Sequence, residues 1–249
     1  MVTYFLWVFA LALKALLIGG LLLNGLSRKY VCFFSYISLV TFLGILRLYV
    51  YIFQPSQYFA LYWWTQFFIV AAGFWVTWEI FGRALQHYLG VSRLARLLVA
   101  GVFLLVLAQF ALNSVAGPLA APVMVLERNM RSVEVALLLS LVSLIMYYRF
   151  PISRNLFGLF LGYGLFLTSH MVALFLHNTL GPSAQSWLNP FRQICELLVI
   201  IVWLATLWNE HPVPLPTVQK LEEDYAVLST RTSRLIANAR AQITRILTS

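Results

Sequence analysis

Residues 2–25 read VTYFLWVFALALKALLIGGLLLNG, and this stretch decides the fold. A helix of about 20 apolar residues crosses the hydrocarbon core of a bilayer, and the stretch is long enough to do so. A cleavable signal peptide would begin with basic residues and have a shorter apolar core. Here the first basic residue, Lys14, lies in the middle of the stretch. We therefore interpret these residues as a retained transmembrane helix.

The rest of the 249-residue chain has the same apolar character. Apolar residues make up 61% of it and charged residues only 10%, whereas soluble domains have about 45–50% and about 25%. Apolar runs of suitable length cover residues 2–25, 31–53, 57–82, 97–116, 132–148, 155–178 and 187–208. The sequence therefore predicts an all-α, polytopic membrane bundle of seven helices. The fifth run is short, so we expect its helix to begin near Val123 as an amphipathic extension above the membrane.

The placement of basic residues predicts the orientation of the bundle. Of the 17 Lys and Arg residues, 12 fall on one side, three on the other and two, Lys14 and Arg47, within the membrane. The side with 12 is cytoplasmic by the positive-inside rule, so the N-terminus lies outside and the C-terminus inside. This placement also explains the net charge of +9 without nucleic acid as a partner. We expect a multi-pass protein of a bacterial cytoplasmic membrane, with the lipid bilayer as its main partner.

The chain divides into a transmembrane domain (residues 1–209), a Pro-rich linker (210–216) and a cytoplasmic amphipathic helix (217–249). Apolar residues recur in the last segment at nearly heptad spacing, interrupted by Thr232 and Gln242. Residues 217–247 therefore predict a helix that pairs with a second copy or with another helical protein. Binding to an anionic membrane surface through the four Arg residues of its second half is the alternative.

Polar residues within the apolar runs are the candidate functional residues, because ionisable groups in a bilayer usually face the bundle interior. Several fall at similar depth in different helices, and we expect them to form a polar chamber in the outer half of the bundle. The candidates for binding a ligand or ion are Lys14, Arg47, Gln66, Gln109, His170, Arg192 and Glu196. Glu127, Arg131 and Glu134 share one helical face and are expected at the rim of the chamber. We expect Arg47 and Glu196 to approach within salt-bridge or one-water distance, with Lys14 and His170 lining the same space. Structural ion pairing of these residues is the alternative to a binding site.

Glu79 and Arg83 lie near the cytoplasmic end of the third helix, four residues apart. This spacing predicts an ion pair at the membrane edge, and a proton-sensitive switch is the alternative. The histidines do not have the spacing of a haem or metal site, since His170 and His177 lie on one helix two turns apart. No motif typical of catalysis is present, so we expect no enzyme, cofactor or bound metal.

Two short motifs, Ser153-Arg154-Asn155-Leu156-Phe157-Gly158 and Trp78-Glu79-Ile80, resemble uncharacterised bacterial seven-helix proteins. They also resemble the membrane regions of seven-helix sensor kinases, although these 249 residues contain no kinase domain. The resemblance implies a sensor or receptor-like module. Gly158 and Gly162 form a small-xxx-small face that favours close helix packing.

The leading hypothesis is a receptor-like protein that binds a small ligand or ion in the outer chamber and signals through its C-terminal helix. A structural subunit of a larger membrane complex and a small-solute transporter are the alternatives. The sequence shows no internal repeat and no pair of Gly- or Pro-broken helices at corresponding positions. Both features are typical of transporters, so their absence argues against that alternative.

Overall fold

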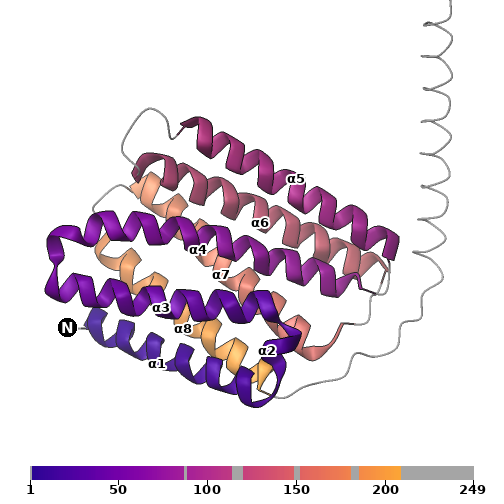
Figure 1. The fold of residues 1–249 in the computed structure, drawn as a ribbon, viewed down its shortest axis with the longest axis horizontal. Coiled ribbons are helices and arrows are strands. Elements are labelled where there is room, and N and C mark those ends of the chain that lie inside the picture. Colours follow the sequence, from indigo (N-terminus) through magenta and orange to yellow (C-terminus); the bar gives the residue numbers. More distant parts are fainter. Residues whose placement is uncertain (1, 87–88, 114–119, 149–151, 181–184, 209–249) are drawn as a thin grey trace, which may run out of the picture.

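The structure is a computed structural model that describes residues 2–86, 89–113, 120–148, 152–180 and 185–208. These residues form α-helices and no strand (Figure 1). The helices are α1 (Val2–Leu23), α2 (Leu26–Lys29), α3 (Val31–Phe53), α4 (Pro55–Ala84), α5 (Leu89–Asn113), α6 (Ala120–Tyr148), α7 (Arg154–Leu180) and α8 (Gln185–Leu207). All except α2 are long and apolar enough to cross a membrane, which confirms the predicted all-α bundle of seven spans.

Local sequence accounts for where several helices begin and end. Gly25 has a φ of 68°, a left-handed conformation that ends α1 and turns the chain into the short α2. Pro55 occupies the first turn of α4, where its missing N–H costs nothing. Ser153 precedes α7, and its hydroxyl accepts a hydrogen bond from the Leu156 N–H at 3.2 Å, as an N-cap does.

The helices lie side by side, with α1 and α8 along one edge and α5 along the other (Figure 1). In the most apolar stretch of α4, 44% of the residues are buried, whereas the corresponding share in α5 is 11%. The α4 helix is therefore the central one. The most extensive contacts join α7 to α8, α3 to α4 and α1 to α8. Exposed Leu, Ile and Phe side chains cover the remaining helix faces. A bilayer accepts this apolar surface, which water would not.

Two helices begin well before the apolar runs that predict them. The α5 helix begins at Leu89 rather than at residue 97. Arginine has a high helix propensity, so Arg93 and Arg96 continue the helix although they lower its hydrophobicity. The α6 helix begins at Ala120, which confirms its early start. The part of α6 that is long and apolar enough to span a membrane runs from Pro122 to Tyr147. The predicted linker (210–216) and C-terminal helix (217–249) lie outside the described residues.

The two glycines of the small-xxx-small face lie against α8. A Cβ atom on Gly158 would overlap the side chain of Thr206, and one on Gly162 would overlap the indole of Trp203. The Asn155 side-chain amide donates to the Thr206 carbonyl at 3.1 Å and holds the same interface. The predicted close packing is confirmed, and the motif from Ser153 to Gly158 has a structural role in it.

The end of the bundle that contains α2 is basic. It includes the last turn of α4 and the first turns of α5 and α7 (Figure 1). Its described basic residues are Arg28, Lys29, Arg83, Arg93, Arg96 and Arg154. We refer to this end as the inner end and to the opposite one as the outer end, following the positive-inside rule.

This orientation gives a first prediction. A reporter that is active only in the cytoplasm should be active when fused at Gly90 or after Ser249, and inactive when fused at Ser183. A paired reporter that is active only outside should give the reverse result. Activity of the cytoplasmic reporter at Ser183 would contradict the orientation.

Candidate functional site

Arg47 reaches from α3 to the neighbouring α4. Its Nε donates to the Thr65 hydroxyl at 2.6 Å, and its Nη2 donates to the Tyr62 carbonyl at 3.2 Å and to Gln66 Oε1 at 3.1 Å. The guanidinium also lies 4.5 Å from the centre of the Tyr62 ring. Gln66 then donates its amide to Glu127 Oε1 on α6 at 2.8 Å. One amide therefore links the cation of α3 to the carboxylate of α6.

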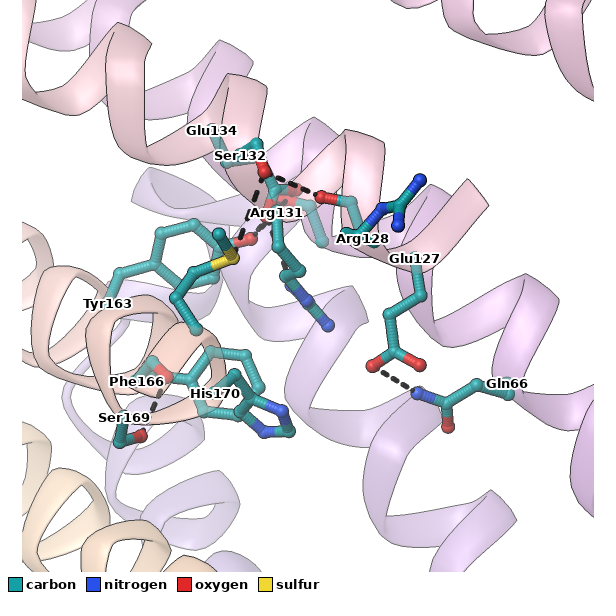
Figure 2. Close-up of polar contacts among 12 residues, drawn as sticks. Gln66, Glu127, Arg128, Arg131, Ser132, Glu134, Tyr163, Phe166, Ser169 and His170 are labelled. Carbon is teal, nitrogen blue, oxygen red and sulfur yellow. Dashed lines mark hydrogen bonds and ion pairs between the residues drawn. The ribbon is translucent and has the colours of Figure 1, made fainter. Parts of the chain in front are cut away.

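Arg131 and Glu134 form an ion pair in the interior of the bundle (Figure 2). Nη1 of Arg131 lies 3.1 Å from Glu134 Oε2, and the two residues are 1% and 0% exposed. The Arg131 guanidinium also lies 5.0 Å from the centre of the Phe166 ring on α7. Its Nε atom is buried and has no hydrogen-bond partner. This pair is thus fully desolvated, and one of its donors is unsatisfied.

A tyrosine of α7 completes this cluster. The Tyr163 hydroxyl donates to the Gly73 carbonyl of α4 at 2.7 Å and lies 3.3 Å from Glu134 Oε1. Gly73 is required for this contact, because a Cβ atom there would lie 2.9 Å from the tyrosine oxygen and 3.2 Å from Arg131 Nη1. Three helices therefore meet at Glu134 through polar contacts.

A third group joins α1 to α8. Lys14 Nζ lies 2.5 Å from Glu196 Oε1, and Lys14 is only 7% exposed. Arg47 was the expected partner of Glu196, but no direct ion pair joins these two residues in the described part of the chain. The reason is the arrangement of helices, since α8 packs on α1 while α3 packs on α4. Lys14 does not snorkel to the surface but is paired inside the bundle.

A fourth group lies between α7 and α8. Arg192 Nη2 lies 3.4 Å from His170 Nδ1, and the His170 ring packs edge-on against Phe166 at 4.5 Å. Arg192 is one turn from Glu196, but Glu196 is engaged by Lys14. Among the described residues Arg192 contacts no carboxylate. Together we call these four groups the outer polar layer, which comprises Lys14, Arg47, Gln66, Glu127, Arg131, Glu134, Tyr163, His170, Arg192 and Glu196.

Two expectations about position need correction. Glu127, Arg131 and Glu134 were expected at the rim of a chamber, but they are 8%, 1% and 0% exposed and lie in the packed interior. Gln109 was expected to line the chamber, but it is exposed on α5, where the Asn129 amide donates to it at 3.2 Å. Gln109 and Asn129 line a shallow surface depression between α5 and α6. Gln109 therefore does not belong to the layer.

The predicted pair of Glu79 and Arg83 is present at the inner end. Arg83 Nη2 lies 3.8 Å from Glu79 Oε1. The other carboxylate oxygen of Glu79 accepts a hydrogen bond from the Phe33 N–H at 2.9 Å and so caps the first turn of α3. Arg83 also lies 5.1 Å from the ring of Tyr30. Burial raises the pKa of the Tyr30 phenol, which keeps this ring neutral beside the pair.

Sequence reasoning missed the contributions of Tyr163, Gly73 and Phe166. Tyr163 lies in an apolar run and gave no signal as a polar residue. The signal that could have found it is its helical spacing, because Tyr163, Phe166 and His170 follow one another at three and four residues on one face of α7.

The outer polar layer, whose residues come from six helices, brings cations, carboxylates and an amide together. Comparisons with protein-family models, with curated proteins and with solved structures found no match to this chain.

Proposed function

We propose that this protein is a receptor-like membrane protein whose outer polar layer responds to a small ligand or ion. The observation that carries the proposal is the number of charged residues that are buried or half-buried where lipid and packing would favour apolar residues. Four cations and three carboxylates meet there from four helices, α1, α3, α6 and α8. Replacing a buried ion pair by apolar residues is often neutral or stabilising, so stability alone does not explain these residues.

The α8 helix supplies the route from the layer to the inner end. It carries Arg192 and Glu196 in its outer half and continues without interruption to Leu207. Its inner half is held tightly by the glycines of α7. Its outer half is held to α1 and α7 through polar contacts of Glu196 and Arg192, and Pro190 removes one backbone hydrogen bond there. A ligand that competes for these charges would displace α8, and the displacement would reach the segment after it.

The second prediction tests this route. In nanodiscs, spin labels at Leu23→Cys on α1 and Ala205→Cys on α8 report the distance between the inner ends of the two helices, with both native cysteines replaced by serine. Glu196→Gln, and the double change Lys14→Met with Glu196→Leu, should shift this distance by about 1–2 Å or broaden its distribution, as helix movements at interfaces do.

Arg128→Gln is the matched control, because Arg128 is an exposed outer-half charge on α6 without a carboxylate partner in the described chain. It should leave the distance unchanged. An unchanged distance in both Glu196 variants, together with a lower melting temperature, would show that the pair is structural only.

A structural subunit of a larger membrane complex is the second candidate. The exposed pair of Gln109 and Asn129 favours it, because amides on an outward helix surface suit contact with another protein. Gln109→Leu should then weaken co-purification with a partner without changing the spin-label distance.

A further inference from the structure

We propose that Arg192 anchors a binding site for a carboxylate or phosphate group between α7 and α8, with His170 as a second donor. This inference rests on the proposed function and names the chemical class of its ligand. It begins from the pairing of charges in the outer polar layer. Glu196 is engaged by Lys14, Glu134 by Arg131, and Glu127 by Gln66, which also binds Arg47. Each carboxylate of the layer is therefore engaged, and Arg192 remains without one.

The Arg192 side chain has donors to offer. A guanidinium carries five N–H groups, and the one contact of this guanidinium in the described chain is the 3.4 Å approach to His170. Arg192 is half-buried on the outer half of α8, so these donors do not all face bulk water. Planar pairs of N–H donors match the oxygens of carboxylate and phosphate groups, and for this reason arginine is common in sites for both.

The orientation of His170 adds a donor at the same place. Because Arg192 has only donors, its contact with Nδ1 requires that this nitrogen carry the lone pair. The neutral ring then carries its proton on Nε2, which has no hydrogen-bond partner in the described chain. An anion between α7 and α8 would thus meet N–H groups from both residues.

Arg131 provides the independent observation. Figure 2 shows its side chain extending from α6 toward Phe166 and His170 of α7. The guanidinium packs on Phe166, whose ring contacts the His170 imidazole. Its Nε, in a residue 1% exposed, has no hydrogen-bond partner. Unsatisfied buried donors are rare in folded proteins, and an anion beside His170 would lie in the field of this second guanidinium.

Two sources supply the same chemistry: a small soluble anion and the headgroup of an anionic lipid. The test uses the full chain in nanodiscs of phosphatidylcholine, with melting temperature followed during titration with inorganic phosphate or succinate at constant ionic strength. We expect a saturable rise, with the apparent dissociation constant raised about tenfold or more in Arg192→Gln. Arg192→Lys, which keeps the charge and loses the planar fork, should give an intermediate constant, and Arg128→Gln the unchanged one.

A second set of nanodiscs contains phosphatidylglycerol. If the lipid headgroup is the occupant, these discs raise the melting temperature without added anion, and Arg192→Gln abolishes the rise. If a soluble anion is the occupant, the titrations are the same in both lipids. A melting temperature that changes equally in wild type, Arg192→Gln and Arg192→Lys in both sets would overturn the site. An Arg192-dependent rise without any change in the spin-label distance would leave the site standing and refute the proposed signalling.

Discussion

Replacing Glu134 by glutamine should destabilise the bundle by about 3–5 kcal/mol. The carboxylate is fully buried and is the only one that contacts Arg131 within the described chain. Its loss leaves an unpaired guanidinium in a site buried from solvent, which is the costly way to break a buried ion pair. Tyr163 keeps its hydrogen bond to Gly73, so the loss should come mainly from the uncompensated charge. Unfolding in mixed micelles with increasing dodecyl sulfate, followed by circular dichroism, measures it.

The double variant Arg131→Met with Glu134→Leu separates charge from packing. It removes both ions and keeps similar volume, so it should recover most of the lost stability. Arg128→Gln, on the exposed face of the same helix, should stay within about 0.5 kcal/mol of wild type. If the double variant were less stable than Glu134→Gln alone, the two residues would contribute through packing rather than as an ion pair.

Gly158→Ala should destabilise by about 1–3 kcal/mol although alanine is the better helix former. The added Cβ overlaps Thr206 at the interface of α7 with α8, and the helices must separate to admit it. Gly162→Ala meets the Trp203 indole and should behave in the same way. The same unfolding measurement applies.

Gly164 offers a matched control on the same helix. A Cβ atom there meets no atom within 4 Å, so Gly164→Ala should be neutral or stabilise by up to about 1 kcal/mol through helix propensity. Combining Gly158→Ala with Thr206→Gly exchanges the small residue between the helices and should restore part of the stability. A Gly158→Ala variant as stable as Gly164→Ala would show that this interface is looser than the structure indicates.

The sequence was sufficient for the helices but not for their neighbours. Length and apolar character predict the seven spans, because crossing a bilayer requires both. The same reasoning locates Lys14, Arg47 and Glu196, since the depth of a residue follows from its position in its helix. It does not give the rotation of each helix about its axis or the identity of the adjacent helix. For this reason the ion pair of Glu196 was assigned to Arg47 on α3, whereas α1 lies next to α8 and supplies Lys14.

Burial of the α6 charges escaped prediction for a related reason. Four ionisable residues within eight positions lowered the apparent hydrophobicity of residues 127–134, so the sequence placed these residues above the membrane. Partners from other helices remove this cost: Gln66 binds Glu127, and Tyr163 approaches Glu134. The hydrophobicity of one helix taken alone does not include these polar partners from α4 and α7.

The contacts between α3 and α4 bear on how the chain enters the membrane. An arginine costs about 2.5–3.5 kcal/mol to insert at the middle of an isolated helix and less toward its ends. Arg47, in the outer half of α3, therefore makes this helix alone a less favourable candidate for release into lipid. The hydrogen bonds of Arg47 in this structure go to Thr65, Tyr62 and Gln66 of α4, and Glu79 of α4 caps α3 at its other end. The two helices are joined by Gln54 alone. They therefore satisfy each other's polar groups before any other helix arrives, and the insertion machinery is expected to release them as a pair.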